Sequence, residues 1–174
     1  MVAKISVGNS LYGAIAYNGE KINEARGRLL TTNRIYNDGS GTMDIHRAME
    51  DFITFMPPQM KVEKPVVHIS LNPHPEDVLT DTELQDIARE YLEKLGFGNQ
   101  PYLVFKHEDI DRHHLHIVTV NVDENGKRLN RVSSIVAVTV SAGNWNRNTA
   151  CIRQNARIAV LTRRCARWTP LRAT

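Results

Sequence analysis

His107, His114 and His116 lie within ten residues of one another in the segment KHEDIDRHHLHIVTVN, which covers residues 106–121 and also contains His113. Side chains of a β-strand alternate between its two faces, so His114 and His116 are expected to point to one side and His113 to the other. A second strand-like run, YLVFKH, ends at His107, and the polar residues after it predict a turn that folds the two runs into a hairpin. The spacing therefore predicts a cluster of three imidazoles, from His107, His114 and His116, that are candidate ligands of a metal ion.

Such a cluster is typical of a catalytic metal centre and not of a closed structural one. Three neutral imidazoles leave coordination positions open for water or for a substrate oxygen. Asp109 and Asp111 lie in the predicted turn and are candidates to accept an N–H from a ligand histidine, which would fix its tautomer. The alternative is a polar turn that carries surface histidines. We favour the metal centre because all three histidines have the spacing that one hairpin would bring together.

The elements that must position this cluster alternate between strands and helices. Their order along the chain is β-α-α-β-α-β-β, which predicts an α+β fold with a central antiparallel sheet and flanking helices. Residues 27–41 are polar and are expected to form a flexible connection without a role in chemistry. The expected strands are residues 2–7, residues 64–72 and the hairpin within 102–121; the expected helices begin at about Leu11, cover residues 43–56, and run from the capping box of Thr80 and Glu83 to Gly96.

The first expected helix carries two tyrosines that are candidates for chemistry. Leu11, Ile15 and Ile22 recur at helical spacing and form its buried stripe, and Tyr17 lies roughly 120° away from that stripe. Tyr17 is therefore free to face a site outside the core. Tyr12 lies nearer to the buried stripe and is the alternative.

Polar residues recur on one face of the otherwise apolar strand KPVVHISLN, residues 64–72. His68, Ser70 and Asn72 share that face because they are two residues apart. One buried polar side chain is usually just hydrogen-bonded within a core. A row of three favours a strand that borders a substrate groove.

Charge is distributed unevenly along the chain of 174 residues, whose formal net charge is +3. All 19 acidic residues precede residue 131, whereas the last 44 residues contain eight arginines and no acid. The overall charge is therefore no indication that the folded part binds nucleic acid. Cys151 and Cys165 lack the spacing of metal ligands. The sequence contains no apolar run long enough to span a membrane and no recognisable leader, so we expect no membrane insertion and a cytoplasmic protein.

These motifs resemble those of the relaxase and mobilisation nuclease family, in particular the MobB-like relaxases of the HUH superfamily. The resemblance covers residues 2 to about 130. Its carriers are NSLYGAIAYNGEK, VVHISLNPHPEDVLTDTEL and the highly specific FKHEDIDRHHLHIVTVNVDENGK. Such enzymes cut one strand of plasmid or transposon DNA at an origin of transfer and stay attached to its 5′ end. The resemblance implies the ferredoxin-like palm of the HUH relaxases.

The resemblance also implies a role for each candidate residue. Tyr17 would attack phosphorus and form a phosphotyrosyl link, and Asp109 would help to remove the phenol proton. Mg²⁺ or Mn²⁺ held by the three histidines would polarise the scissile phosphate, although imidazole ligation suits late transition metals better than Mg²⁺. Expected partners are single-stranded origin-of-transfer DNA, mobilisation accessory proteins and a coupling protein. Contacts with DNA would come from His68, Ser70, Lys127 and Arg128.

Residues 131–174 differ in character from the rest of the chain. They contain no lysine and no acid, but both tryptophans and both cysteines. The family would continue here with a charged helix. We hypothesise a reading-frame shift that leaves an incomplete relaxase domain over residues 1–130 and a basic, disordered tail. The alternatives are a basic arm that folds on DNA and, because residues 135–140 are β-prone, an additional strand.

Two other functions are compatible with the same residues. A metal-dependent hydrolase or oxygenase could use the three histidines without a tyrosine nucleophile, and an inactive remnant of a relaxase could bind DNA without cutting it. The tyrosine near the N-terminus and the segment around His68 favour a mobilisation relaxase over a replication initiator of the same superfamily. Replacement of Tyr17 by phenylalanine distinguishes the relaxase from the hydrolase.

Overall fold

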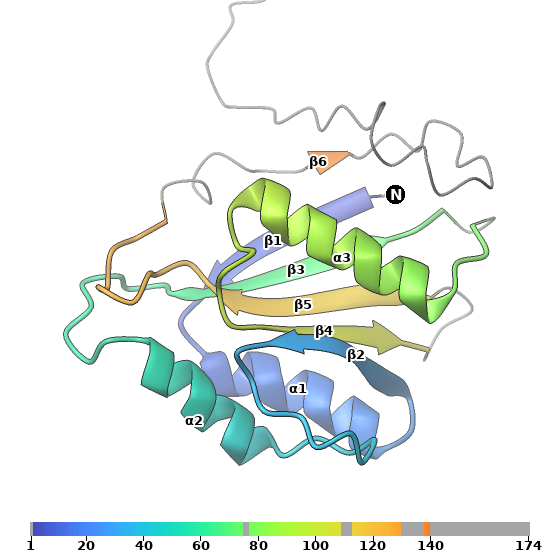
Figure 1. Ribbon diagram of the computed structural model, residues 1–174, viewed down its shortest axis with the longest axis horizontal. Coiled ribbons are helices and arrows are strands. Elements are labelled where there is room, and N and C mark those ends of the chain that lie inside the picture. Colours follow the sequence, from blue (N-terminus) through green and yellow to red (C-terminus); the bar gives the residue numbers. More distant parts are fainter. Residues whose placement is uncertain (1, 75–76, 109–112, 130–137, 140–174) are drawn as a thin grey trace, which may run out of the picture.

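The computed structural model describes residues 2–74, 77–108, 113–129 and 138–139. These residues form an antiparallel sheet with the strand order β2-β4-β5-β3-β1-β6 and three helices, which confirms the predicted α+β fold (Figure 1). No helix within the described ranges is both long enough and apolar enough to cross a lipid bilayer. The strands are β1 (Val2–Gly8), β2 (Gly27–Asn33), β3 (Val66–Asn72), β4 (Tyr102–His107), β5 (His114–Val120) and β6 (Val138–Thr139); the helices are α1 (Leu11–Asn23), α2 (Ile45–Phe55) and α3 (Asp81–Leu95).

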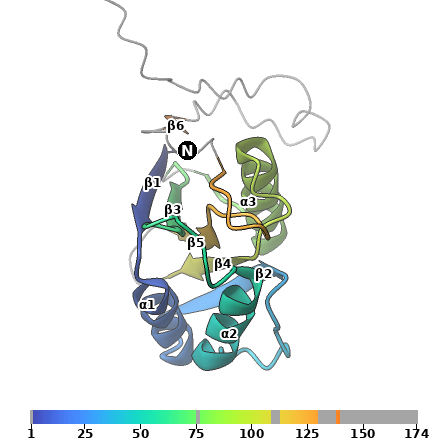
Figure 2. The same ribbon diagram turned by 90° about the vertical axis from the view of Figure 1, so that its left-hand side faces the viewer.

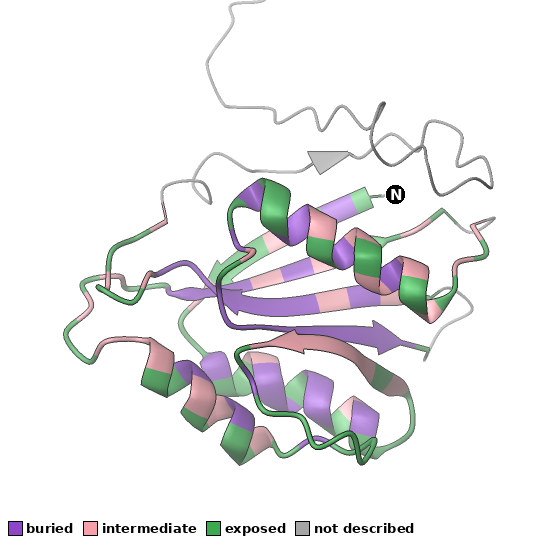
Figure 3. Ribbon diagram, in the orientation of Figure 1, coloured by how far each residue is buried: buried purple, intermediate pink, exposed green. Residues whose placement is uncertain are grey.

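The helices cover the two faces of the sheet unequally. Figures 1 and 2 show α1 and α2 together on one side, and α3 alone on the other. Alternation along each strand produces two separate cores. The core under α3 includes Leu115 and Ile117 of β5, whereas the core under α1 and α2 includes Val118 and Val120 of the same strand. Strand β4 is buried along its whole length (Figure 3).

Side chains at the helix ends explain where the helices begin and end. The Ser10 hydroxyl accepts a hydrogen bond from the Gly13 amide at the start of α1. Thr80 and Glu83 form the predicted capping box of α3, and Gly96 ends that helix with a left-handed backbone at φ 81°. These local signals explain the ends of α1 and α3.

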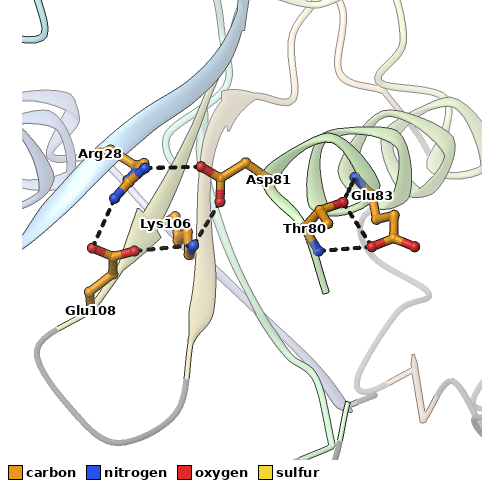
Figure 4. Close-up of polar contacts among 6 residues, drawn as sticks. All are labelled: Arg28, Thr80, Asp81, Glu83, Lys106 and Glu108. Atoms are coloured by element: carbon orange, nitrogen blue, oxygen red, sulfur yellow. Dashed lines mark hydrogen bonds and ion pairs between the residues drawn. The ribbon is translucent and has the colours of Figure 1, made fainter. Parts of the chain in front are cut away.

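An ion network joins β2, β4 and α3 on the face opposite the histidines (Figure 4). Lys106, whose side chain is 8% exposed, contacts Asp81 at 2.7 Å and Glu108 at 3.1 Å. Arg28 contacts the same two carboxylates at 3.1 and 3.4 Å. The network closes into a ring of two cations and two anions, and it ties the end of β4 to its neighbours.

The charges in this network change one another's pKa. The hydrogen bond from Lys106 lowers the pKa of Asp81. Burial alone would raise the pKa of Glu108 and lower that of Lys106, but the hydrogen bonds and opposite charges outweigh burial. The pKa of Glu108 is consequently lowered and that of Lys106 is raised, so all three groups are charged at neutral pH.

The prediction of a flexible connection over residues 27–41 is wrong for its first half. Residues 27–33 form β2, which pairs with β4 at the edge of the sheet and has a bulge between Leu29 and Thr31. Most residues of this strand are half-buried, and buried and exposed residues do not alternate along it. An edge strand is held by one neighbour through backbone hydrogen bonds, so its position does not depend on such an alternation. In the expected tail, Val138 and Thr139 pair with β1; residues 130–137 and 140–174 lie outside the described ranges.

Candidate active site

The three histidines face one another across the β4–β5 hairpin, on the side of α1. His107 lies directly opposite His114 in the strand register, and His116 lies opposite Phe105. The ring centroid of His107 is 5.2 Å from that of His114 and 4.3 Å from that of His116, and the last two centroids are 4.9 Å apart. One ligand nitrogen from each residue lies within 4.8 Å of the others. The predicted cluster is therefore present.

Burial and charge keep the cluster suitable for a cation. His107 is fully buried, and His114 and His116 are half-buried. Burial, followed by the neighbouring histidines and Lys21, lowers the pKa of His116 to about 3. That imidazole is therefore neutral at neutral pH and keeps the lone pair that a metal ligand needs. The donor set of three imidazoles, one of them fully buried, fits a divalent ion with open coordination positions.

Helix α1 places Tyr17 at the entrance of this cluster. Tyr17 is 53% exposed, and its ring centroid is 6.1 Å from that of His107. Lys21, one turn later, holds its Nζ 4.9 Å from the centre of the same ring. Tyr12 lies in the first turn of α1, and within the described part of the chain no ring contact joins it to the histidines. Of the two tyrosines, Tyr17 is the one beside the cluster.

A fourth histidine contacts the cluster from β3. His68 Nε2 lies 2.9 Å from His116 Nδ1, and the two ring planes are nearly parallel, with centroids 4.9 Å apart and an angle of 13° between the planes. Burial lowers the pKa of His68. Ser70 is paired with His116 across the strands, and its hydroxyl accepts a hydrogen bond from Asn72. His68, Ser70 and Asn72 share one face, as expected from the sequence.

Two of the predicted DNA-contacting residues lie far from the histidines. Lys127 and Arg128 are exposed and follow β5 at the end opposite His114; Arg128 bridges to Val122. Val122 follows His116 by six positions, which corresponds to roughly 20 Å of extended chain. Asp109 and Asp111 lie outside the described residues, so their predicted roles stay predictions.

The comparisons with known proteins agree with this geometry. Residues 17–137 match the family model of relaxases, described as the MobA/VirD2-like nuclease domain. The match covers more than half of the chain. The chain belongs to the relaxase family. No curated protein and no solved structure matches it significantly.

The relaxase contains site residues that the sequence pattern did not reveal. Lys21 follows Tyr17 by four residues, a spacing that places both on one face of a helix and that could have signalled the pair. Lys4 and Ser6 of β1 are exposed and lie opposite Ser70 and His68 in the register. Their side chains extend the polar row of β3 towards the edge of the sheet. The contact between His68 and His116 depends on strand register and has no signal in the sequence.

Gly27 allows this relaxase to place β2 directly against the hairpin that carries the three histidines. It lies opposite His107 in the register. A Cβ atom on Gly27 would be 2.7 Å from the Lys106 carbonyl oxygen and 3.3 Å from His107 Cδ2. A side chain at this position would push β2 or His107 away. The backbone of β2 therefore packs directly against the buried His107, and no side chain fits between them.

Proposed function

We propose that this relaxase nicks one strand of DNA at an origin of transfer and forms a covalent 5′-phosphotyrosyl intermediate. One observation carries the proposal: in a chain of this family, an exposed tyrosine lies with its ring 6.1 Å from a buried histidine of a three-histidine cluster. The proposal is supported by a phenol that lies beside three candidate ligands of a divalent cation. A nucleophile next to such a cation suits the activation of a phosphate for attack.

The histidine cluster would hold the divalent ion, Mg²⁺ or Mn²⁺, through His107, His114 and His116. When bound, such an ion polarises the scissile phosphate and offsets the negative charge that develops during attack. The chain supplies fixed ligands for this purpose: strand pairing sets the spacing of His107 and His114, and burial keeps His116 neutral. Lys21, beside Tyr17, adds a positive charge at the entrance where the phosphate would lie.

Tyr17 would carry out the covalent step. Its phenol oxygen forms a new bond to phosphorus, and the bond from phosphorus to the 3′ oxygen of the preceding nucleotide breaks. The phenol proton leaves to a base or to water, and the departing oxygen takes up a proton and becomes a 3′-hydroxyl. Asp109 is our candidate for the proton acceptor, directly or through a histidine. Since one phosphodiester replaces another, the reverse reaction can rejoin the strand.

The single-stranded DNA would approach across the face of the sheet that α1 leaves open. The polar row of Lys4, Ser6, His68 and Ser70 leads from the histidine cluster to the β1 edge. Lys127 and Arg128 lie near the other end of β5. They would contact phosphates only if the bound DNA strand extends from the histidine cluster to that end of the sheet. Mobilisation accessory proteins and a coupling protein are the further partners that we propose for a mobilisation relaxase.

The test is a covalent trapping experiment with the full chain. Labelled single-stranded origin-of-transfer DNA is incubated with the protein and Mn²⁺, and denaturing electrophoresis reports a protein–DNA adduct. We expect an adduct that is absent from Tyr17→Phe, present in Tyr12→Phe, and lost with His114→Ala or after chelation of the metal. An adduct that persists in Tyr17→Phe would refute the assignment of the nucleophile.

The competing functions give different outcomes in the same experiment. Turnover without any adduct, unchanged in Tyr17→Phe, would identify a metal-dependent hydrolase or oxygenase. Binding of DNA and of metal without cleavage would identify an inactive remnant. Either result would refute the proposed strand transfer.

A further inference from the structure

We propose that His68 is a positioning residue of the metal centre, because its Nε2 accepts a hydrogen bond from His116 Nδ1–H and leaves His116 Nε2 to bind the ion. The inference rests on the proposed function, in which His116 is a metal ligand. It replaces the expectation that His68 acts on DNA with a role inside the protein. The residue would act through His116, without contact with the ion or the substrate.

The contact between the two histidines follows from the pairing of β3 with β5. His68 lies opposite Val118 in the register, so His116 is its diagonal neighbour, two residues along the adjacent strand. Diagonal neighbours on one face of an antiparallel pair are within reach of aromatic side chains. The nitrogen atoms are 2.9 Å apart, which is a normal hydrogen-bond distance. Strand pairing on both sides of β3, with β1 and β5, holds His68 in place.

The tautomers follow from the requirements of a metal ligand. A neutral imidazole carries one proton, and the nitrogen without it binds the metal. If His116 binds through Nε2, its proton is on Nδ1, which is the atom that faces His68. His68 Nε2 must then be the acceptor, and the proton of His68 must be on Nδ1. One hydrogen bond thereby determines the tautomer of both rings.

His68 lies outside the set of residues that can share one ion. Among the described residues, the group whose ligand atoms approach one another closely enough contains His107, His114 and His116 only. Metal-binding histidines usually donate their second N–H to a carboxylate, a backbone carbonyl or water, and this outer partner orients the ring. In this relaxase, a neutral imidazole from a neighbouring strand occupies the place of that acceptor.

The inference and the DNA-contact expectation predict different results when no DNA is present. A residue that only touches DNA leaves the metal affinity of the free protein unchanged. An outer partner of a ligand changes that affinity, and loss of such a partner typically weakens metal binding roughly 10- to 100-fold. The affinity for the metal alone therefore separates the two roles.

We would titrate the full chain with Mn²⁺ alone, without DNA, and measure the dissociation constant by calorimetry. His68→Ala should bind Mn²⁺ roughly 10- to 100-fold more weakly than the unmodified protein. His68→Gln should remain close to the unmodified protein, because its amide oxygen can accept the same hydrogen bond. His46→Ala is the matched control, since His46 is an exposed histidine of α2 outside the cluster, and it should leave the affinity unchanged. His114→Ala should remove binding.

Three outcomes would overturn the inference. Equal affinities for His68→Ala and the unmodified protein would show that the contact does not orient His116. Losses in His68→Ala and His68→Gln as large as in His114→Ala would make His68 a ligand itself. Absence of Mn²⁺ binding by the unmodified protein would refute the metal centre as a whole. A normal Mn²⁺ result together with no DNA adduct would leave this inference standing and refute only the strand transfer. Circular dichroism and thermal unfolding of each metal-free variant verify that it is folded.

Discussion

The close approach of β2 to the hairpin that carries the three histidines makes Gly27→Ala the most informative single change. The added Cβ would lie 2.7 Å from the Lys106 carbonyl oxygen. Carbon and oxygen normally approach to about 3.3 Å even in the closest favourable contacts, so the backbone must move by about 0.6 Å. The atom that must yield belongs to a buried strand and is not the end of a flexible side chain.

The expected cost follows from two opposing effects. Overpacking of this kind destabilises a protein by about 1–3 kcal/mol. Alanine in place of glycine reduces the conformational entropy of the unfolded chain, which stabilises the folded protein by about 0.5–1 kcal/mol. We therefore expect Gly27→Ala to lower the free energy of unfolding by about 1–2 kcal/mol. The metal affinity should fall as well, because His107 lies 3.3 Å from the new atom and metal–ligand distances tolerate only about 0.2 Å.

Chemical denaturation and Mn²⁺ titration measure the two effects, and Gly8→Ala is the matched control. Gly8 ends β1, pairs with Val66, and has no atom within 4 Å of the position that a Cβ would occupy. Gly8→Ala should be neutral or slightly stabilising and should not affect Mn²⁺ binding. If Gly27→Ala unfolds and binds metal as Gly8→Ala does, the edge strand shifts freely, and the argument that Gly27 holds His107 in place is refuted.

Two further predictions concern charged residues near the site. The pKa values of Asp81 and Glu108 are lowered in the folded protein. As the pH falls below 4.5, the ordinary pKa of a glutamate, the unfolded chain therefore takes up protons before the folded protein does. The stability that these two carboxylates contribute above that pH is then lost. Lys106→Met should make this acid-induced loss shallower in denaturant titrations across the acid range, and parallel curves would contradict the ion network. Lys21→Gln should weaken binding of single-stranded DNA by Tyr17→Phe protein and reduce the slope of log affinity against log salt by about 0.7, the value for one phosphate contact. Lys94→Gln, on α3 across the sheet, is the control, and equal slopes for the two variants would exclude Lys21 from phosphate binding.

The histidine cluster was predictable because its geometry is local. Alternation along one strand places His114 and His116 on the same side, and the pairing of β4 with β5 brings His107 to them. The starts of α1 and α3 were predictable for the same reason, because Ser10 and Thr80 accept hydrogen bonds from amides three residues further along the chain. Such patterns depend only on residues that are close together in the sequence, so they can be recognised without knowledge of the tertiary fold.

The remaining features depend on contacts between distant segments. β2 was missed because an edge strand with a bulge carries no alternation, and its position is set by pairing with β4. The contact of His68 with His116 was not predicted, because residues 48 positions apart in the chain become neighbours only through the β3–β5 register. Lys127 and Arg128 are close to the histidines in sequence, whereas the straight course of β5 carries them to the opposite end.

The same contrast between local and distant contacts bears on how the site assembles during folding. A hairpin closes the loop between His107 and His114 at little entropic cost, so the ligand set can form while much of the chain is still unfolded. Metal bound to such a partly folded chain stabilises the native state by less than its affinity for the native site would imply. Tyr17 joins the three histidines only when α1 is packed on the sheet. Under the proposed function, weakened packing of α1 would leave a protein that chelates metal without cutting DNA, and strand cleavage would report completion of the fold.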